Sequence, residues 1–439
     1  MRLIDTKRQE KRHIAKPIKK DKDMTYRITA PQQLETEINL PASKSISNRA
    51  LIIYALSGRK TMPEHLSDCD DTEVMINALR DMPETIDIKA GGTAMRFLTA
   101  YLAVTPGEHT ITGTERMRHR PINILADALL RLGADVAYEE NEGFPPLRIK
   151  GRQLQGGSLE VQGDVSSQFI SALLMIAPGM EKGLTLHLTG DIISRPYIDL
   201  TLCTMRNFGA DAEWTDNDTI EVKPQPYTAQ DYYIESDWSA ASYWYEILAL
   251  SKDNEAEIKL NGLMDGSLQG DSVVKYLFSM LGIKTSFSSR TRNVPTTVTL
   301  RKTGLVSARL DYNFINQPDL AQTFVVTCAL MGVPFHFTGV ATLHIKETDR
   351  IVALKTEMRK LGYVISDGDG TELIWDGERC EPEENPIIDT YEDHRMALAF
   401  APAASQIPGL GINNPQVVTK SYPHFWKDLA DAGFLISEE

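Results

Sequence analysis

Cysteine is scarce in this sequence of 439 residues, and the few that occur do not cluster. The four cysteines are Cys69, Cys203, Cys328 and Cys380, and no two of them have the Cys-x-x-Cys spacing of zinc sites and redox motifs. The nine histidines also show no spacing typical of metal ligands. We therefore predict no metal site, no disulfide and a reducing, cytoplasmic environment.

The sequence also lacks an excess of positive charge. Its 46 Lys and Arg stand against 60 Asp and Glu, which gives a formal net charge of −14. A nucleic-acid-binding protein normally carries a basic face, so nucleic acid is not expected as a partner. The cations that are present gather in short motifs, and an acidic protein that concentrates Lys and Arg in one cleft suits a small polyanion.

No apolar run is long enough to suggest a membrane span. The longest lies near residues 324–337, and it is short and interrupted. A hydrophobic content of 42% predicts large cores, and the length favours two domains over one. Residues 1–23 are rich in Lys and Arg without the apolar stretch of a secretory signal, so we expect a disordered basic tail there.

The most informative motif spans residues 343–350, whose last five residues combine two cations with two carboxylates. A carboxylate beside a lysine can exchange protons near neutral pH, and an arginine can bind a phosphate or a carboxylate through two parallel hydrogen bonds. The alternative is a salt-bridged helix start with Thr348 or Asp349 as the N-cap.

Five further runs also carry Lys or Arg at a turn that leads into a predicted helix. They are residues 41–49, 91–96, 116–121, 391–396 and 419–423. A helix N-terminus exposes free N–H groups at the positive end of its dipole and so attracts anions. One such run is usually an ordinary capped helix, but six in one chain indicate convergence on a strongly anionic ligand.

A helix, a turn and a strand recur along the chain. The pattern is found at residues 122–138, 197–214, 271–287, 349–366 and 423–436, with a weaker copy at 71–88. Alternating strand-like runs lie between these copies, as at residues 184–189 and 297–301. Six similar units in two domains predict an α/β fold with three βαβαββ modules in each domain.

Together, the motifs resemble those of 5-enolpyruvylshikimate-3-phosphate synthase. The resemblance covers nearly the whole chain from Met24 onward, in the same order, and rests on Lys420 and the runs PASKSISNRA, GGTAMRF, RHRPI, VSSQF, SRPYID, HIKETDR and YEDHRMA. It implies two inside-out α/β prisms with helices in their interiors and the active site in the cleft between them. The order of the motifs further predicts a discontinuous domain of residues 24–41 and 236–439, with residues 42–235 inserted.

This resemblance also implies a reaction. The 5-hydroxyl of shikimate-3-phosphate attacks C2 of phosphoenolpyruvate, C3 is protonated, and the tetrahedral intermediate loses phosphate to leave an enolpyruvyl ether. No metal or organic cofactor takes part. The site must then neutralise two phosphates and two carboxylates, and it must place a base near the 5-hydroxyl and an acid near the methylene. We expect a cytoplasmic monomer that acts on these two small molecules, without membrane or nucleic-acid partners.

Site residues are implied motif by motif. Contacts to shikimate-3-phosphate are implied for Lys44, Ser45, Arg49, Ser166, Ser167, Gln168, Ser194, Asp319 and Lys346, with Tyr197 packed on the ring. Contacts to phosphoenolpyruvate are implied for Lys44, Gly92, Arg120, Gln168, Arg350, Arg395 and Lys420. The two serines that precede Gln168 also have a competing interpretation as ordinary helix caps.

The resemblance leaves three candidates for catalysis. Asp319 is the expected base for the 5-hydroxyl, although it also fits an N-cap of the helix that follows it. Glu347 is the expected acid, with Lys346 beside it to adjust its pKa, and Lys44 is the third catalytic candidate. Two carboxylates in one cleft can divide acid and base work when their neighbours hold their pKa values apart. Asp70 fits a supporting acidic position.

Three positions depart from the family's common pattern. Residues 90–93 lack an Asn that many members have and carry an additional glycine, Thr342 stands where some members have Asn, and Phe97 stands where some have Pro. None of these changes removes a charged group of the predicted site. They leave open the sensitivity to glyphosate, the inhibitor that mimics phosphoenolpyruvate.

Three other functions compete with this interpretation. UDP-N-acetylglucosamine enolpyruvyl transferase shares the fold and chemistry, but it normally has Lys-Asn where this chain has Lys44-Ser45, and a cysteine in a loop where residues 112–121 contain none. RNA-phosphate cyclases share the module, but they need a nucleotidylated histidine and a basic surface. A non-catalytic protein that binds phosphorylated metabolites should lack Lys44, Asp319 or Glu347, and substrate-dependent phosphate release separates it from an enzyme.

Overall fold

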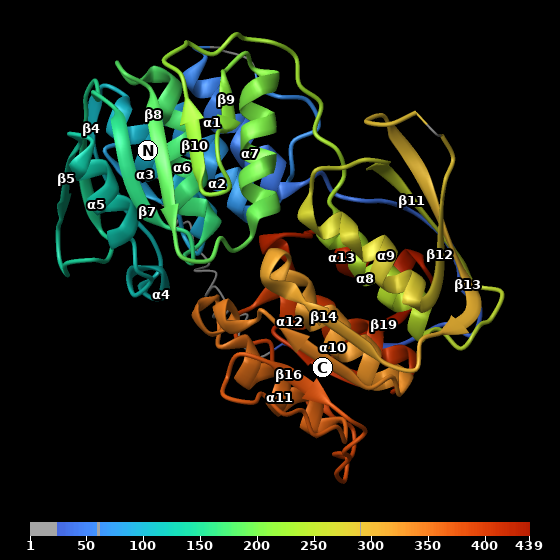
Figure 1. Ribbon diagram of the computed structural model, residues 1–439. Helices are drawn as coiled ribbons and strands as arrows, with labels where there is room; N and C mark the ends of the chain where they lie inside the picture. The colour runs from blue at the N-terminus through green and yellow to red at the C-terminus, as the bar shows by residue number, and fades with distance from the viewer. Residues whose placement is uncertain (1–23, 59–61, 290) are drawn as a thin grey trace, which may run out of the picture.

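The computed structural model describes residues 24–58, 62–289 and 291–439, and it has two lobes that meet at the centre of the molecule (Figure 1). The expected tail at residues 1–23 lies outside the described residues. One hydrophobic core contains residues from Leu51 to Tyr227, and the other combines residues from Ile28 to Leu40 with residues from Trp238 to Phe434. Each lobe therefore has its own interior.

Two units of the first lobe have the predicted order of strand, helix, strand, helix and two strands. One consists of β3 (Thr85–Asp87), α3 (Gly92–Val104), β4 (Gly107–Thr112), α5 (Asn123–Arg131), β5 (Asp135–Tyr138) and β6 (Leu147–Gly151), with the short helix α4 (Glu115–Arg118) before α5. The other consists of β7 (Gly157–Gln162), α6 (Ser167–Ile176), β8 (Leu184–Thr189), α7 (Arg195–Asn207), β9 (Ala212–Trp214) and β10 (Thr219–Val222).

The third unit of this lobe is only partly built among the described residues. Its helices are α1 (Lys44–Leu56) and α2 (Asp70–Asp81). An isolated bridge between Glu64 and Tyr233 stands where the other units have a sheet.

The second lobe has three units. The first contains β2 (Glu35–Asn39), α8 (Trp238–Leu250), β11 (Glu257–Met264), α9 (Val274–Met280), β12 (Leu281–Phe287) and β13 (Pro295–Val306). The second contains β14 (Leu310–Asn313), α10 (Ala321–Met331), β15 (Phe335–Thr338), α11 (Arg350–Lys360) and β16 (Leu373–Trp375). The third contains β17 (Ile387–Ile388), α12 (His394–Phe400), β18 (Leu410–Asn413), α13 (Phe425–Asp431), β19 (Leu435–Glu438) and β1 (Thr25–Thr29).

All five of these sheets share one pairing pattern. The first two strands of each unit are parallel, as β7 and β8 are, and the later strands join antiparallel, as β10 does beside β8. The strand predicted at the end of the pattern at residues 349–366 was wrong, because no strand forms between α11 and β16. Tyr363 bridges Arg379 while Ser366 bridges Ile374, so the register shifts between the two bridges and no continuous ladder forms.

The interior helices explain why the fold is inside out. Helices α1, α3 and α6 pack on one another in the first lobe, and α10 packs against both α8 and α12 in the second. Residues 321–329 of α10 are all buried, so this helix has no solvent-facing side. Helix α10 is buried on every side and largely apolar because sheets and neighbouring helices surround it, and Gln322, Thr323 and Thr327 are its buried polar residues.

The chain passes between the lobes at two adjacent segments. Ala42 forms an antiparallel bridge with Ser236, and the backbone N–H of Ser43 donates to the carbonyl of Glu235 at 2.8 Å. The domain boundaries predicted near residues 41 and 236 stay a prediction. No helix in the described part of the chain is both long and apolar enough to cross a membrane.

Candidate active site

A cavity of about 260 Å³ lies between the lobes, at the N-terminal ends of interior helices. Helix α1 begins at Lys44, α3 at Gly92, α6 at Ser167 and α12 at His394, and all four of these residues line the cavity. Each N-terminus presents free N–H groups and the positive end of a helix dipole. The convergence predicted from the motifs is therefore present, and it favours an anionic ligand.

The side chains strengthen this preference. Four carboxylates in the lining, from Asp71, Asp164, Asp319 and Glu347, face seven Lys and Arg side chains, which leaves an excess of three positive charges. The seven cations are Lys44, Arg49, Arg96, Arg120, Lys346, Arg350 and Arg395. This excess occurs in a protein of net charge −14, so the cavity is a local cationic site.

Arg350 is the centre of the ion pairs on the second-lobe side. Its Nη1 lies 2.8 Å from Asp319 Oδ1, its Nη2 lies 3.0 Å from Glu347 Oε2, and its Nε lies 2.7 Å from Asp393 Oδ2. The guanidinium is almost fully buried, so these three carboxylates fix its plane. Arg350 thereby holds Asp319 and Glu347 on either side of one rigid cation.

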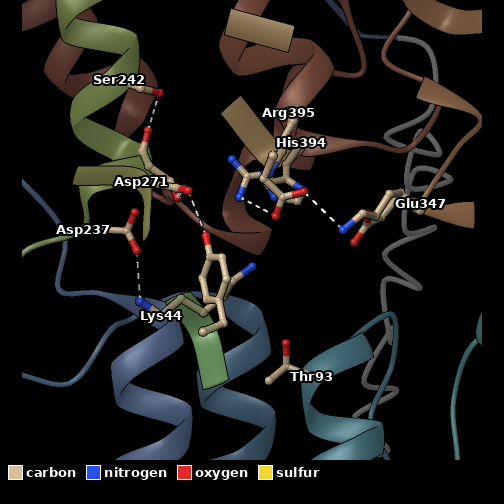
Figure 2. A network of polar contacts seen from close by, with 12 residues as sticks. Lys44, Thr93, Asp237, Ser242, Asp271, Glu347, His394 and Arg395 are labelled. Atoms are coloured by element: carbon tan, nitrogen blue, oxygen red, sulfur yellow. Dashed lines mark hydrogen bonds and ion pairs between the residues drawn. The ribbon is translucent and has the colours of Figure 1, made fainter. Parts of the chain in front are cut away.

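Further cations complete the surroundings of the two carboxylates. Asp319 also pairs with Arg395 Nη2 at 3.1 Å and with Lys346 Nζ at 3.3 Å. Glu347 accepts from Lys420 Nζ at 2.6 Å. Figure 2 shows Glu347, His394 and Arg395 at this side of the site, opposite Lys44.

Both carboxylates are ionised in this arrangement. Burial alone would raise the pKa of Asp319, but Arg395, Lys346 and Arg350 outweigh burial and hold its pKa well below the ordinary value. Burial would likewise raise the pKa of Glu347, but Lys420, Arg350 and Arg120 hold it well below the ordinary value. Lys346 was expected to adjust Glu347, and the structure instead places its ammonium on Asp319.

Lys44 lies at the first turn of α1 and points into the cavity from the first lobe. Its backbone N–H donates to Asp237 Oδ2 at 3.2 Å, an interaction drawn in Figure 2, and its Nζ lies 3.4 Å from Asp71 Oδ2. Burial would lower the pKa of Lys44, but Asp71, Cys69 and Glu347 together outweigh burial, so the pKa is raised and the side chain is a cation. Asp70, the supporting carboxylate suggested by the sequence, is exposed and bonds to Thr419, while its neighbour Asp71 lines the cavity.

Arg49 differs from the other cations because neutral oxygens hold it. Its Nε donates to Thr201 Oγ1 at 2.7 Å, its Nη1 to the Ser45 carbonyl at 2.8 Å, and its Nη2 to Ser171 Oγ at 3.2 Å. No carboxylate of the described residues pairs with it, and burial lowers its pKa to about 10, which still leaves it charged. This buried cation is therefore oriented and not neutralised by the protein.

The start of α3 is packed against two guanidinium groups. A Cβ added to Gly92 would lie 2.7 Å from Arg120 Nη1 and 2.9 Å from Arg96 Nη1, both inside normal contact distance. Burial and then Arg120 lower the pKa of Arg96 to about 9, and its Nε has no partner among the described residues. Only glycine lets these cations approach the helix N-terminus so closely.

The remaining predicted residues lie on the first-lobe wall. Ser166 caps α6 by accepting from the N–H of Gln168 at 3.4 Å, and the Gln168 amide donates to Thr93 Oγ1 at 3.1 Å. Ser194 has a left-handed backbone (φ 53°) just before α7, where Tyr197 follows. The serine caps foreseen as an alternative are thus present in part, without removing these side chains from the cavity.

The structure brings nearly all of the predicted residues to one place. Every one of them lines the cavity except Asp70, which is exposed, and Lys420, which reaches the cavity through Glu347. Asp349 does cap α11, since it accepts from the N–H of Val352 at 3.1 Å. The suggestion that Asp319 caps the next helix was wrong, because Leu320 holds the N-cap position of α10 and Asp319 is turned to the arginines.

Four ionisable lining residues were not predicted as site residues, namely Asp71, Arg96, Asp164 and His394. His394 is buried, neither ring nitrogen has a hydrogen-bond partner in the described part of the chain, and burial and then Lys44 lower its pKa well below the ordinary value. Arg96 and His394 stand inside two of the cation-bearing runs, so position in a run was the available signal for them, whereas Asp71 and Asp164 lie outside those runs. Among the described residues, no group of three or more His, Cys, Asp and Glu side chains could hold a metal ion.

Known proteins match this chain over almost its whole length. A sequence model described as EPSP synthase (3-phosphoshikimate 1-carboxyvinyltransferase) matches residues 28–429. A 3-phosphoshikimate 1-carboxyvinyltransferase of Bacteroides fragilis is 59% identical over 411 residues, which cover 94% of this chain and 98% of the relative. One of Photobacterium profundum is 35% identical over 427 residues, with 91% and 96% covered.

Solved structures show the same fold at low sequence identity. The EPSP synthase of Acinetobacter baumannii superposes with a TM-score of 0.73 at 19% identity and covers 95% of this chain and all of its own. The enolpyruvyl transferase NikO of Streptomyces tendae has a TM-score of 0.74 at 15% identity, with 95% and 99% covered. Together with the family match and the close relatives, these likenesses establish a two-domain α/β fold, and the chain belongs to the EPSP synthase (3-phosphoshikimate 1-carboxyvinyltransferase) family.

Proposed function

We propose that this protein transfers the enolpyruvyl group of phosphoenolpyruvate to the 5-hydroxyl of shikimate-3-phosphate and releases phosphate. The observation that carries the proposal is the pair of ionised carboxylates, Asp319 and Glu347, held on either side of Arg350 inside a cationic cavity. The reaction needs one group for the 5-hydroxyl proton and one for the methylene carbon, among charges that neutralise two anionic substrates. The family relationship supports the same chemistry.

Shikimate-3-phosphate would bind on the first-lobe wall. The N-terminus of α6, with Ser166, Ser167 and Gln168, offers N–H and hydroxyl donors to the 3-phosphate. Arg49 offers a buried cation that no described carboxylate neutralises, which suits the ring carboxylate. Ser194, Tyr197 and Ser45 line the same wall, and Lys346 completes the proposed contacts from the second lobe.

Phosphoenolpyruvate would bind between Lys44 and the cations of the second lobe. Arg350 and Arg395 line the cavity while carboxylates hold them in place, and Lys420 reaches it through Glu347. Arg120 and the N-terminus at Gly92 close the pocket from the first lobe, and the missing side chain at Gly92 leaves room for the anion to approach the backbone. Gln168 lies between the two substrate regions.

Asp319 is the proposed base. Its carboxylate is ionised and therefore able to accept the 5-hydroxyl proton, but three cations make it a weak base. Substrate phosphates and carboxylates that bind to Arg395, Lys346 and Arg350 would share these cations, and the pKa of Asp319 should then rise toward a useful range. Substrate binding thus places the 5-hydroxyl in the site and also makes Asp319 a stronger base.

Glu347 is the proposed proton carrier at the methylene. It must gain a proton before it can give one, because Lys420 and Arg350 keep it ionised. The carboxylate and phosphate of phosphoenolpyruvate would draw Lys420 and Arg350 away electrostatically, which raises the pKa of Glu347. A proton on Glu347 then passes to C3 as the 5-oxygen bonds to C2, and the same group takes a methyl proton back when phosphate leaves.

Lys44 is the proposed stabiliser of the departing phosphate. Its ammonium enters the cavity from the first lobe, opposite the arginines of the second, so an anion between them is held from both sides. The charge that develops on the leaving group therefore meets a preorganised cation. The proposed steps need no metal or organic cofactor, because Asp319 and Glu347 carry every proton that is transferred.

We also propose that the protein works as a cytoplasmic monomer without nucleic-acid partners, with a domain of residues 24–41 and 236–439 and an inserted domain of residues 42–235. The scattered cysteines and the net charge of −14 support the location and the absence of a nucleic-acid surface. Light scattering at several protein concentrations tests the monomer. A mass that grows with concentration would contradict it.

The reaction is tested by phosphate release. The purified protein should release phosphate from phosphoenolpyruvate only when shikimate-3-phosphate is present, and a metal chelator should leave the rate unchanged. UDP-N-acetylglucosamine in place of shikimate-3-phosphate should give no release. Release with the UDP-sugar alone would assign the protein to the other enolpyruvyl transfer, and release with neither acceptor would refute both.

A further inference from the structure

One hydrogen bond joins the wall of the cavity in the first lobe to a buried carboxylate of the second. Tyr197 of α7 lines the cavity, and its hydroxyl donates to Asp271 Oδ1 at 2.8 Å. Asp271 lies in a 3₁₀ turn, Gly270–Val273, between β11 and α9. Figure 2 shows its side chain on the second-lobe side of the site.

The other oxygen of Asp271 is bound within the second lobe. Ser239, in the first turn of α8, donates its hydroxyl to Asp271 Oδ2, and Ser242 in turn donates to the Ser239 carbonyl at 2.6 Å. Asp271 is about 1% exposed, so both of its oxygens are satisfied by hydroxyl donors away from water. The carboxylate is therefore rigidly placed by its own lobe and offers one oxygen to the other.

The backbone around this bond is closely fitted. A Cβ on Gly270 would lie 3.0 Å from the Cβ of Pro196, at the start of α7. The N–H of Ser194 donates to the Ile315 carbonyl of the second lobe at 2.9 Å. The start of α7 thus touches the second lobe at three points, and these contacts exist only while the lobes are together.

The charged and polar groups near Asp271 come from several different elements of the fold. Arg395 of α12 attracts its negative charge, whereas Asp319 repels it, and the hydroxyls of Ser239 and Tyr197 stabilise it. Burial is the largest influence and raises the pKa of Asp271 to about 6, which these neighbours only partly offset. The phenol of Tyr312 also faces it. Asp271 does not line the cavity, so it acts on a substrate only through Tyr197.

We propose that Asp271 is a positioning residue for shikimate-3-phosphate, which holds the Tyr197 hydroxyl across the lobe interface and so fixes the ring face against which the substrate packs. The proposal rests on the proposed function, because it assumes this substrate on the first-lobe wall. A tyrosine without this bond could rotate at its χ1 and leave the ring unsupported. When the lobes close, the bond to Asp271 therefore forms and fixes the Tyr197 ring against the substrate at the same time.

The first test is a double-mutant cycle on binding. Tyr197→Phe removes the hydroxyl donor, and Asp271→Asn removes the charge of the acceptor. Each variant should lower the affinity for shikimate-3-phosphate, measured by calorimetric titration, by about 10-fold, as expected for a hydrogen bond to a charged group. The double variant should bind no more weakly than the weaker single variant. Turnover at saturating substrates should fall less than affinity does, because neither group touches the reacting atoms.

Tyr245→Phe is the matched control. Its phenol is buried and bonds to Thr285 at 2.9 Å inside the second lobe, away from the cavity. It should lower thermal stability to a similar extent and leave the affinity unchanged. If Tyr197→Phe and Asp271→Asn behave like this control, the role is structural and the proposal fails.

The pH profile separates positioning from folding. The ionised carboxylate is the stronger acceptor, so the ratio of wild-type to Asp271→Asn affinity should rise from near one at about pH 5 to about 10 at about pH 7.5. The ratio removes the titration of the substrate phosphate, which both proteins share. An affinity ratio independent of pH would overturn the proposal, and so would losses of binding free energy that add in the double-mutant cycle. In either case, activity of the wild-type protein would leave the proposed function intact. A wild-type protein that neither binds nor converts shikimate-3-phosphate would refute both.

Discussion

Replacing Glu347 with Gln should leave both substrates bound and nearly abolish turnover. Gln keeps the length of the side chain and an oxygen for Lys420, which lies 2.6 Å from the present carboxylate. Arg350 should stay in place, because Asp319 at 2.8 Å and Asp393 at 2.7 Å still hold it. The loss of one negative charge among cations should, if anything, favour an anionic substrate.

The expected size of the effect follows from the proton that Gln cannot carry. General acid–base groups contribute about 10²- to 10⁴-fold, so Glu347→Gln should raise the activation free energy by roughly 3–5 kcal/mol. Steady-state phosphate release gives the turnover number, and calorimetric titration gives the affinity for each substrate separately. Turnover should fall by this factor while each dissociation constant changes by less than about threefold.

Glu257→Gln is a matched control, because Glu257 on β11 also lies between two cations, Arg301 and Lys259, but outside the cavity. Its activity should stay within about twofold of the wild type, the range expected of a surface pair. If Glu347→Gln retained near-normal turnover, the proton-carrier role would be wrong, and Lys44 or Lys346 would become the better donor. If affinity for phosphoenolpyruvate fell as far as turnover, Glu347 would be a binding group only.

Other side chains give predictions that a titration or an unfolding curve can check. Lys420→Ala should lower the affinity for phosphoenolpyruvate by about 10- to 100-fold and change the affinity for shikimate-3-phosphate little. Arg49→Ala should lower the affinity for shikimate-3-phosphate and change that for phosphoenolpyruvate little. Equal losses of affinity for the two substrates would contradict the division of the cavity into two substrate regions. Gly92→Ala should raise the KM of phosphoenolpyruvate about 10-fold by displacing Arg120, 2.7 Å from the new Cβ, and an unchanged KM would remove Arg120 from that pocket. Burial raises the pKa of Glu246 well above its ordinary value, and the Thr327 hydroxyl offsets only part of that rise. Because the folded-state pKa exceeds the unfolded one, stability should fall as pH rises above the unfolded pKa, so Glu246→Gln should be more stable than wild type at about pH 8 and lose this advantage near about pH 4.

The sequence was sufficient for the fold because its signals are local. Strand-like runs at residues 184–189 and 297–301 became β8 and part of β13, and cation-bearing turns became helix N-termini. The strand expected after α11 failed for a non-local reason, since its pairing depends on Arg379 and Ile374 and shifts register between them. Periodicity alone carries no information about such a partner.

The candidate site was predictable as a set of residues, and not as a set of contacts. Each run could be recognised by its cations, yet which carboxylate each cation meets depends on packing between helices. Lys346 stands beside Glu347 in sequence but binds Asp319, and Asp319 is turned toward α11 and α12 and does not cap its own helix. The bond between Tyr197 and Asp271 joins residues 74 positions apart in different lobes, which no local pattern could indicate.

If the proposed function is right, this cavity joins phosphoenolpyruvate to the 5-oxygen of shikimate-3-phosphate. The most direct measurement is a nuclear magnetic resonance spectrum of the reaction with phosphoenolpyruvate isotopically labelled at C2. The labelled carbon should appear in an enolpyruvyl ether on the 5-oxygen, in amounts equal to the phosphate released. Label that remains in phosphoenolpyruvate, or that appears as free pyruvate while phosphate accumulates, would contradict it.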